Sequence, residues 1–272
     1  MLRVPTLLKL TLCLIAAPAS AQIPGADGEL AVGLAAQEKG DYERAFQHLQ
    51  RAVVLDPGMI KAHFALATVA DHLCLPNAEP GPDTNVCGIA VQEYEKVPEL
   101  DASRQDALKS LAYLLYQFNR VNESEVYYRR DYELNENDPE AMCALAALDF
   151  RRVWVDLSET RVALQLPPGT PLVSSPACNE VRGRIQPGVG EGIALLLRAV
   201  RAIDNDSDLK EYLSAFYMVR SQIQCGNSRA SSADIKTAKA WSRRAKHTSQ
   251  TNAQQHSFTK CPPAPPPAPD RE

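Results

Sequence analysis

Histidine and cysteine side chains, which are common protein ligands of zinc, occur close together at His63, His72, Cys74 and Cys87. The two histidines are nine positions apart on one predicted helix, about two and a half turns, so they point to opposite sides and are poorly placed to share one ion. Because the chain begins like an exported protein, the two cysteines favour a disulfide. We therefore predict no metal site and interpret both histidines as surface residues.

Other patterns that could carry chemistry are incomplete. The chain contains no Gly-x-Ser-x-Gly, His-Glu-x-x-His, Cys-x-x-Cys or Walker sequence. The glycines of 188–192 precede a helix, but the polar stretch before them cannot be the buried strand that a nucleotide fold needs. The aspartates of 204–208 alternate as in a calcium loop, yet Leu209 replaces the required glycine and Ala215 the bidentate glutamate. We predict no catalytic residue and no cofactor, and hence no enzyme.

The start of the chain has the features of a secretory signal peptide. Arg3 and Lys9 flank a short apolar run, 10–17, and small side chains follow at 19–21, where a signal peptidase cleaves. The run is too short to cross a bilayer, which takes about 20 apolar residues. We expect residues 1–21 to be removed, leaving an exported protein, periplasmic or secreted, without a transmembrane span; the alternative is an uncleaved anchor helix.

Charge and cysteine content narrow the class of protein further. A net charge of -4 argues against a nucleic-acid partner, since such proteins are strongly basic. Six cysteines follow residue 21, an even number that indicates disulfides in an exported chain. Cys74 and Cys87 bracket a segment rich in proline, glycine and asparagine and form the favoured pair. Cys178 and Cys225 are further candidates, but the sequence leaves the pairing of the last four cysteines open.

Residues 29–57 predict two helices that pack closely. A Gly-Asp pair at 40–41 separates them, and small residues at Gly33, Ala45 and Ala52 lie on the facing sides. Small side chains let helices approach, while larger neighbours fill the gaps. Neither helix could bury its apolar face alone.

This hairpin resembles a tetratricopeptide repeat (TPR). The sequence departs from the family at Glu29, where a large aromatic residue is usual, and at Ala36, where tyrosine is common. The matching residues are Gly33, Gly40, Asp41, Tyr42, Ala45, Leu49, Ala52, Asp56 and Pro57. The resemblance covers about residues 26–150 in good register and 190–246 loosely.

The resemblance implies an all-α fold, an α-solenoid of TPR-like helix hairpins. We expect repeats over 26–153 and further TPR-like helices over 189–247. Between them, the prolines of 154–188 predict an irregular insertion with at most short helices. The final segment, 248–272, ends in a proline-rich stretch that we expect to be disordered, solvated and without buried residues.

In this family a partner would bind the concave face formed by the first helix of each repeat. Aromatic rings interleaved with charged groups would suit an extended or helical peptide. The alternative is that the same rings are ordinary packing between repeats. By repeat register the groove should present Lys61, Phe64, Asp71, Lys109, Tyr113, Tyr116, Gln117, Cys143, Phe150 and Arg151.

The last predicted helix carries a cluster of cations around one acid, Asp234. A solvated outer face explains this cluster, with an anionic partner as the alternative. The cations are Arg229, Lys236, Lys239, Arg243, Arg244 and Lys246. The sequence thus predicts a scaffold that binds a protein or peptide in the cell envelope or outside the cell. Two alternatives stay open: a structural subunit of an envelope assembly with no exchangeable ligand, and an enzyme that uses the 154–188 insertion.

Overall fold

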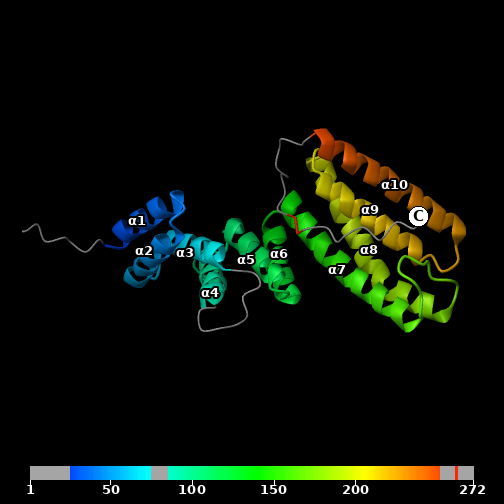
Figure 1. Cartoon of the computed structure of the whole chain (residues 1–272), viewed down its shortest axis with the longest axis horizontal. Helices are drawn as coiled ribbons and strands as arrows, with labels where there is room; N and C mark the ends of the chain where they lie inside the picture. Colours follow the sequence, from blue (N-terminus) through cyan, green and yellow to red (C-terminus); the bar gives the residue numbers. More distant parts are fainter. Residues whose placement is uncertain (1–24, 75–84, 252–260, 263–272) are drawn as a thin grey trace, which may run out of the picture.

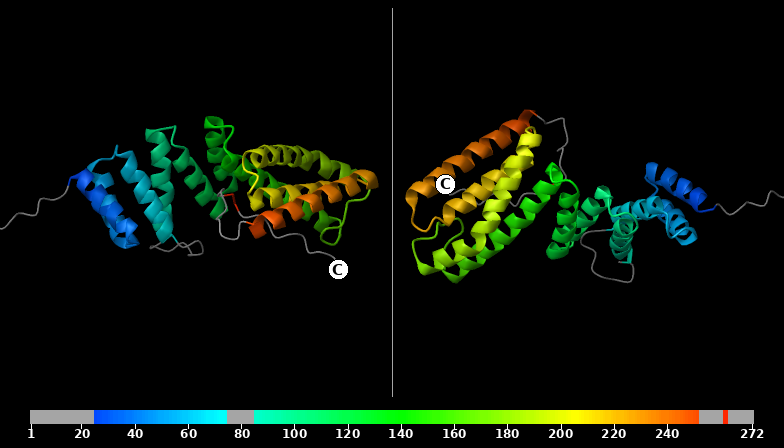
Figure 2. Two further views of the ribbon diagram at one scale, coloured as in Figure 1. Left: turned by 90° about the horizontal axis from the view of Figure 1, so that it is seen from above. Right: turned by 180° about the vertical axis from the view of Figure 1, so that it is seen from behind.

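The computed structural model describes residues 25–74, 85–251 and 261–262, which form ten α-helices and no strand. Each helix packs on the next, so the chain advances as a stack of antiparallel hairpins along an elongated body (Figures 1 and 2). The helices are α1 (Ala26–Glu38), α2 (Tyr42–Leu55), α3 (Ile60–Leu73), α4 (Asn85–Leu100), α5 (Gln105–Gln117), α6 (Val121–Leu134), α7 (Pro139–Ala163), α8 (Pro176–Ala202), α9 (Ser207–Gln222) and α10 (Ser228–Thr251).

The α1–α2 hairpin forms where the sequence predicts it. Gly40 adopts a φ of 75°, which ends α1, and the Asp41 side chain accepts a hydrogen bond from the Arg44 amide to cap α2. Gly33 lies so close to α2 that a Cβ there would stand 2.7 Å from Leu49 Cγ. The glycine is therefore what allows the two helices to pack at this distance.

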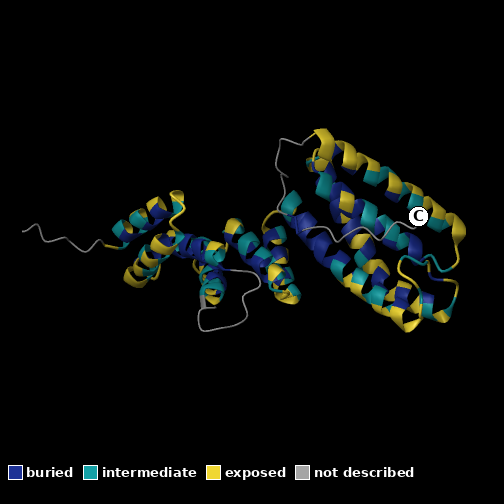
Figure 3. Cartoon of the chain, in the orientation of Figure 1, coloured by how far each residue is buried: buried dark blue, intermediate teal, exposed yellow. Residues whose placement is uncertain are grey.

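The next two hairpins follow the same plan. α3 pairs with α4 and α5 with α6, and Ala90, Tyr94, Val97 and Tyr128 are all buried. A disulfide joins Cys74 at the end of α3 to Cys87 in the first turn of α4, with Cα atoms 4.9 Å apart, as predicted. Buried residues face the helix contacts along the whole stack (Figure 3).

The prediction of an irregular insertion over 154–188 is wrong for most of that segment. α7 continues to Ala163 and is 25 residues long, and α8 starts at Pro176 and is 27 residues long. Pro176 takes the first turn of α8, where its missing N–H costs nothing, and Pro187 is accommodated inside the helix. Only residues 164–175 lie outside the two helices. The segment thus packs as a hairpin, α7 against α8.

Two of the last three helices, α8 and α10, are longer than any helix from α1 to α6. α8, α9 and α10 pack in sequence, and α10 extends to Thr251, beyond the predicted boundary at 247. A second disulfide joins Cys178 on α8 to Cys225 after α9, with Cα atoms 5.6 Å apart. Both of these cysteines are ones that the sequence analysis names as candidates.

The prediction that the proline-rich segment buries nothing is also wrong at its start. Cys261 forms a disulfide with Cys143 on α7, and the Tyr212 hydroxyl donates a hydrogen bond of 2.9 Å to the Pro262 carbonyl. Both residues of this short described stretch are buried. The predicted signal peptide, 1–21, and the remainder of the segment, 252–260 and 263–272, lie outside the described residues. Among the described helices, none is both long and apolar enough to cross a bilayer.

Candidate functional site

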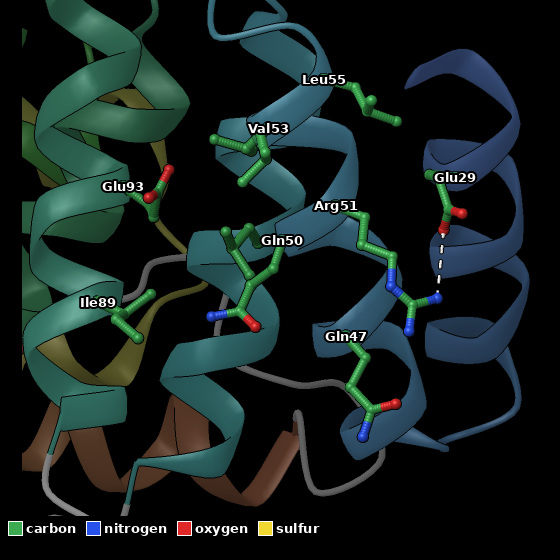
Figure 4. Close-up of a pocket in the computed structure, with 10 residues that line it drawn as sticks. Glu29, Gln47, Gln50, Arg51, Val53, Leu55, Ile89 and Glu93 are labelled. Carbon is green, nitrogen blue, oxygen red and sulfur yellow. Dashed lines mark ion pairs between the residues drawn. The ribbon is translucent and has the colours of Figure 1, made fainter. Parts of the chain in front are cut away.

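A groove of about 630 Å³ lies on the side of the second helices, between α2 and α4; we call it the α2–α4 groove. Val53, Val54 and Leu55 from α2 and Ile89 from α4 supply its apolar part. Gln47, Gln50 and Arg51 lie along the same stretch of α2, with Glu93 across from them on α4 (Figure 4). An apolar strip edged by amides and charges is the composition of a protein-binding surface.

Two apolar side chains of the groove are largely exposed. Val54 has an exposed fraction of 78% and Leu55 of 52%, although both lie within three residues of the completely buried Ala52. Apolar residues gathered at the edge of a hollow mark interaction sites more often than apolar residues scattered singly do. The groove therefore offers an apolar contact area with hydrogen-bonding groups beside it.

Glu29 forms one end of the groove. Its contacts explain why this position does not carry the aromatic residue that is usual in the family. Its carboxylate is buried, with an Oε2 atom 2.6 Å from Nδ1 of His48 and 4.0 Å from the Arg51 guanidinium (Figure 4). The buried acid is thus paired with two side chains from α2. Arg51 is left more than half exposed, so it can also meet an acceptor on a bound molecule.

The other end of the groove is fixed by Glu93 and His63. The His63 ring is buried, with Nδ1 2.5 Å from Glu93 Oε2 and Nε2 2.9 Å from the Pro57 carbonyl oxygen. The interpretation of His63 as a surface residue is therefore wrong, because its two nitrogens tie α3 to α4 and to the turn before α3. His72 is exposed and stacks on Tyr42 at 4.7 Å between ring centroids. Within the described ranges, no group of three or more candidate ligands is placed to hold a metal ion.

The first-helix residues predicted to line a groove fall into two sets. Those nearer α1 are engaged with neighbouring helices or scattered: Lys61 is exposed on α3, Asp71 is half-buried, and Phe64 packs against Tyr94 with the Arg104 guanidinium 5.1 Å from its ring centre. None of these three residues lines the α2–α4 groove or the second hollow, which lies beside α7.

Lys109 is half-buried and links α5 to the start of α7. Its Nζ donates to Asp138 at 3.0 Å and to Glu140 at 2.9 Å. Burial lowers the pKa of Lys109, but the hydrogen bonds that it donates to Glu140 and Asp138 raise this pKa above its ordinary value. Two acids already match its charge, so Lys109 acts as an inter-repeat connection and offers little to an anionic partner.

The second set of predicted residues does come together. Tyr116, Phe150 and Arg151 line a hollow of about 270 Å³, which we call the aromatic hollow, and the Arg151 guanidinium stands 5.4 Å from the Tyr116 ring centre. Tyr113 is half-buried beside the same core, and Gln117 is exposed one residue beyond Tyr116. Cys143 is completely buried by its disulfide and presents nothing to a partner.

Sequence reasoning missed two further rings of the aromatic hollow, Trp154 and Tyr212. Trp154 lies one turn after Phe150 on α7, with ring centroids 6.0 Å apart, and Tyr212 reaches the same place from α9. The four-residue spacing of Phe150 and Trp154 indicates that both rings lie on one face of a helix. Trp154 was missed because an irregular insertion was predicted to start at residue 154. Tyr212 is brought in by the packing of α9 on α7, which no local pattern encodes.

The cationic cluster of the last helix is divided by the structure. Asp234 is buried and accepts from Arg220 on α9, at 3.0 Å from Nε, and from Gln224 at 2.6 Å, so it belongs to the α9–α10 contact. Arg244 lies over the Trp241 ring at 4.7 Å. The cations predicted from the sequence are all exposed along α10: Arg229, Lys236, Lys239, Arg243, Arg244 and Lys246.

The fold of this chain matches solved structures, although its sequence matches no known family. No family model matches the sequence, and no curated protein matches it either. The crystal structure of MamA protein has a TM-score of 0.56 at 12% identity, covering 85% of this chain and 95% of its own. MamA 41-end from Desulfovibrio magneticus RS-1 gives 0.53 at 12% identity, with 85% and 97% covered. YrrB, described as a TPR protein with an unusual peptide-binding site, gives 0.52 at 15% identity, with 83% and 92% covered. The chain therefore has the TPR fold.

Proposed function

We propose that this protein is a non-catalytic TPR scaffold, exported from the cell, that binds another protein or a peptide at the α2–α4 groove. The observation that carries the proposal is the exposure of Val54 and Leu55 at the edge of a hollow of about 630 Å³. A partner that covers two such side chains gains hydrophobic free energy without losing any contact that stabilises the fold. YrrB, which shares the fold, is described as having an unusual peptide-binding site.

The shape and polarity of the groove favour a segment with apolar side chains and at least one acceptor. Arg51 and Gln50, which line the same groove as Val54 and Leu55, can donate hydrogen bonds to a bound molecule. Glu93 uses its Oε2 atom in the contact with His63. The occupant expected here is a helix or an extended segment that places one or two apolar residues between α2 and α4 and a carboxylate near Arg51.

Three disulfides support the proposed export. The two cysteines of each pair are 13, 47 and 118 positions apart in the sequence. Such bonds persist in oxidising compartments such as the bacterial periplasm or the extracellular space. The proposed route is the predicted signal peptide over 1–21.

The enzyme alternative loses its basis. It depended on 154–188 having no role in building the repeats, but residues 154–163 and 176–188 form helix and pack as part of the α7–α8 hairpin. Val181, Ile185 and Val189 from this segment are buried in the core.

The test uses two valines of equal exposure. Val54 in the groove and Val162 on α7 are both 78% exposed, so aspartate at either position should leave the fold intact. The oxidised chain is immobilised and incubated with an envelope extract from its own source. We expect the native chain and Val162→Asp to recover the same partner, and Val54→Asp to recover at least about tenfold less, which corresponds to about 1.4 kcal/mol. Equal recovery by both variants would exclude the α2–α4 groove as the binding site.

The same experiment separates a scaffold from a fixed structural subunit. A scaffold releases its partner on washing and takes it up again, and free partner competes for the groove. A structural subunit co-purifies with a stoichiometric neighbour that does not exchange. We expect exchange, because the exposed apolar area of the groove is small compared with that of an obligate interface.

A further inference from the structure

The aromatic hollow begins where the described part of the proline-rich segment ends. Pro262 is held by the Cys143–Cys261 disulfide on α7 and by the hydrogen bond from Tyr212 on α9. The ring of the same tyrosine lines the hollow, and Ala147, one helical turn after Cys143, lines it too. The chain that follows Pro262 therefore starts at the edge of this hollow.

The hollow has the lining that proline-rich segments bind. Four aromatic residues line it: Tyr116 and Trp154 are partly exposed, and Phe150 and Tyr212 are buried. Phe150 stacks on Trp154 and meets Tyr212 edge to face, each at 6.0 Å between centroids. Grooves between aromatic rings receive the ridges of a polyproline II helix, which loses little entropy on binding because each proline already has a fixed φ.

The sequence after Pro262 is of that type. Residues 263–269 read Pro-Ala-Pro-Pro-Pro-Ala-Pro. Seven residues in a polyproline II conformation extend about 22 Å. The part of α7 that lines the hollow, from Ala147 to Val155, is about 12 Å long. The segment is thus long enough to cover the hollow from its point of attachment.

We propose that residues 263–269 of this chain occupy the aromatic hollow as a polyproline II segment, so that the protein covers this part of its own first-helix face. The Cys143–Cys261 disulfide makes the contact intramolecular. A short tether gives an effective concentration on the order of millimolar. A free proline-rich peptide with a Kd of about 0.1 mM would then bind about tenfold more weakly to the native chain than to one whose own segment cannot dock.

The test follows the fluorescence of Trp154. Trp241→Phe leaves Trp154 as the single tryptophan of the chain, since the sequence has two. In this background one variant carries serine at positions 263, 265, 266, 267 and 269, which keeps the length and the Cys143–Cys261 bond but removes the polyproline preference. The control variant carries Pro167→Ser and Pro168→Ser in the exposed α7–α8 connection.

Two readouts decide the proposal. We expect acrylamide to quench Trp154 less in the native and control chains than in the serine variant. The synthetic peptide PAPPPAP should bind the serine variant about tenfold more tightly than the native chain. Equal quenching in all three chains, or equal peptide affinity, would overturn the proposal. Protection that disappears on dilution would also overturn it, because the segment would then be docking on a second copy.

Discussion

Replacing Gly192 by alanine tests the close packing on which the α7–α10 half depends. Gly192 lies on α8 against the ring of Phe216, which is completely buried and meets Phe150 edge to face at 5.1 Å. A Cβ at Gly192 would stand 2.7 Å from Cε2 and 2.8 Å from Cε1 of that ring, and closer still to Cζ. Two positions earlier on the same helix, a Cβ at Gly190 would meet nothing within 4 Å.

The two substitutions should change stability in opposite directions. Alanine is preferred over glycine in a helix by about 0.8–1.0 kcal/mol, so Gly190→Ala should stabilise the protein by about that amount. Gly192→Ala has the same helix preference, but carbon atoms pack at about 3.5–4.0 Å, so the Phe216 ring would have to move by about 1 Å within a filled core. Overpacking of this kind costs about 1–3 kcal/mol. Since the helix preference is common to both variants, their difference in stability should equal the overpacking cost, about 1–3 kcal/mol.

Urea unfolding with the disulfides intact measures this difference. Both tryptophans, Trp154 and Trp241, lie on α7 and α10, so their fluorescence reports the affected half of the chain. For a chain of this size the predicted difference corresponds to about 2–12 °C in Tm. If Gly192→Ala proved as stable as Gly190→Ala, the close approach of α8 to α9 would be wrong, and with it the placement of Tyr212 in the aromatic hollow.

Three other perturbations have defined outcomes. Burial and the Glu191 carboxylate raise the pKa of Asp149 to about 7. The contribution of Asp149 to stability is therefore present below about pH 4 and lost as the pH rises toward 7. In urea titrations at several pH values, the free energy of unfolding of Asp149→Asn relative to the native chain should increase over that window by up to about 4 kcal/mol. Replacing Cys143 and Cys261 together by serine opens a loop of 118 positions and should cost about 4–5 kcal/mol, while peptide mapping without reduction should recover this pair in the native protein. Asp234→Ala leaves the Arg220 guanidinium without its buried partner and should lower the free energy of unfolding by about 3 kcal/mol, whereas a loss under 0.5 kcal/mol would show that water replaces the acid.

The repeats near α1 could be predicted because their signals are local. A glycine-aspartate break, a cap and small residues at helical spacing fall within 30 residues of one another, and each has a direct consequence for the backbone. The α1–α2 hairpin therefore follows from the sequence. The first disulfide, Cys74–Cys87, was predictable for the same reason.

The α7–α8 hairpin was missed because proline and glycine were given more weight than apolar spacing. Val181, Ile185 and Val189 recur every four residues and are all buried on one face of α8. That spacing indicates a helix, and it continues through Pro187. A proline inside a helix is tolerated when tertiary packing compensates for the lost hydrogen bond, and that compensation is not visible in a local window.

The candidate sites depend on contacts that the sequence does not encode locally. Cys143 and Cys261 pair across 118 positions, and Tyr212 joins Phe150 from another hairpin. The α2–α4 groove was missed for a different reason. The resemblance to TPR proteins predicts binding on the first helix of each repeat, but the exposed Val54 and Leu55 belong to a second helix.

Photo-crosslinking from the groove tests the central claim most directly. A photoreactive phenylalanine analogue is placed at Val54 or at Val162 in the intact chain, expressed in its own source, because both positions are equally exposed. We predict one discrete adduct with a second protein from position 54 and none from position 162. The same adduct from both positions, or from neither, would contradict the account of the α2–α4 groove as a partner-binding site.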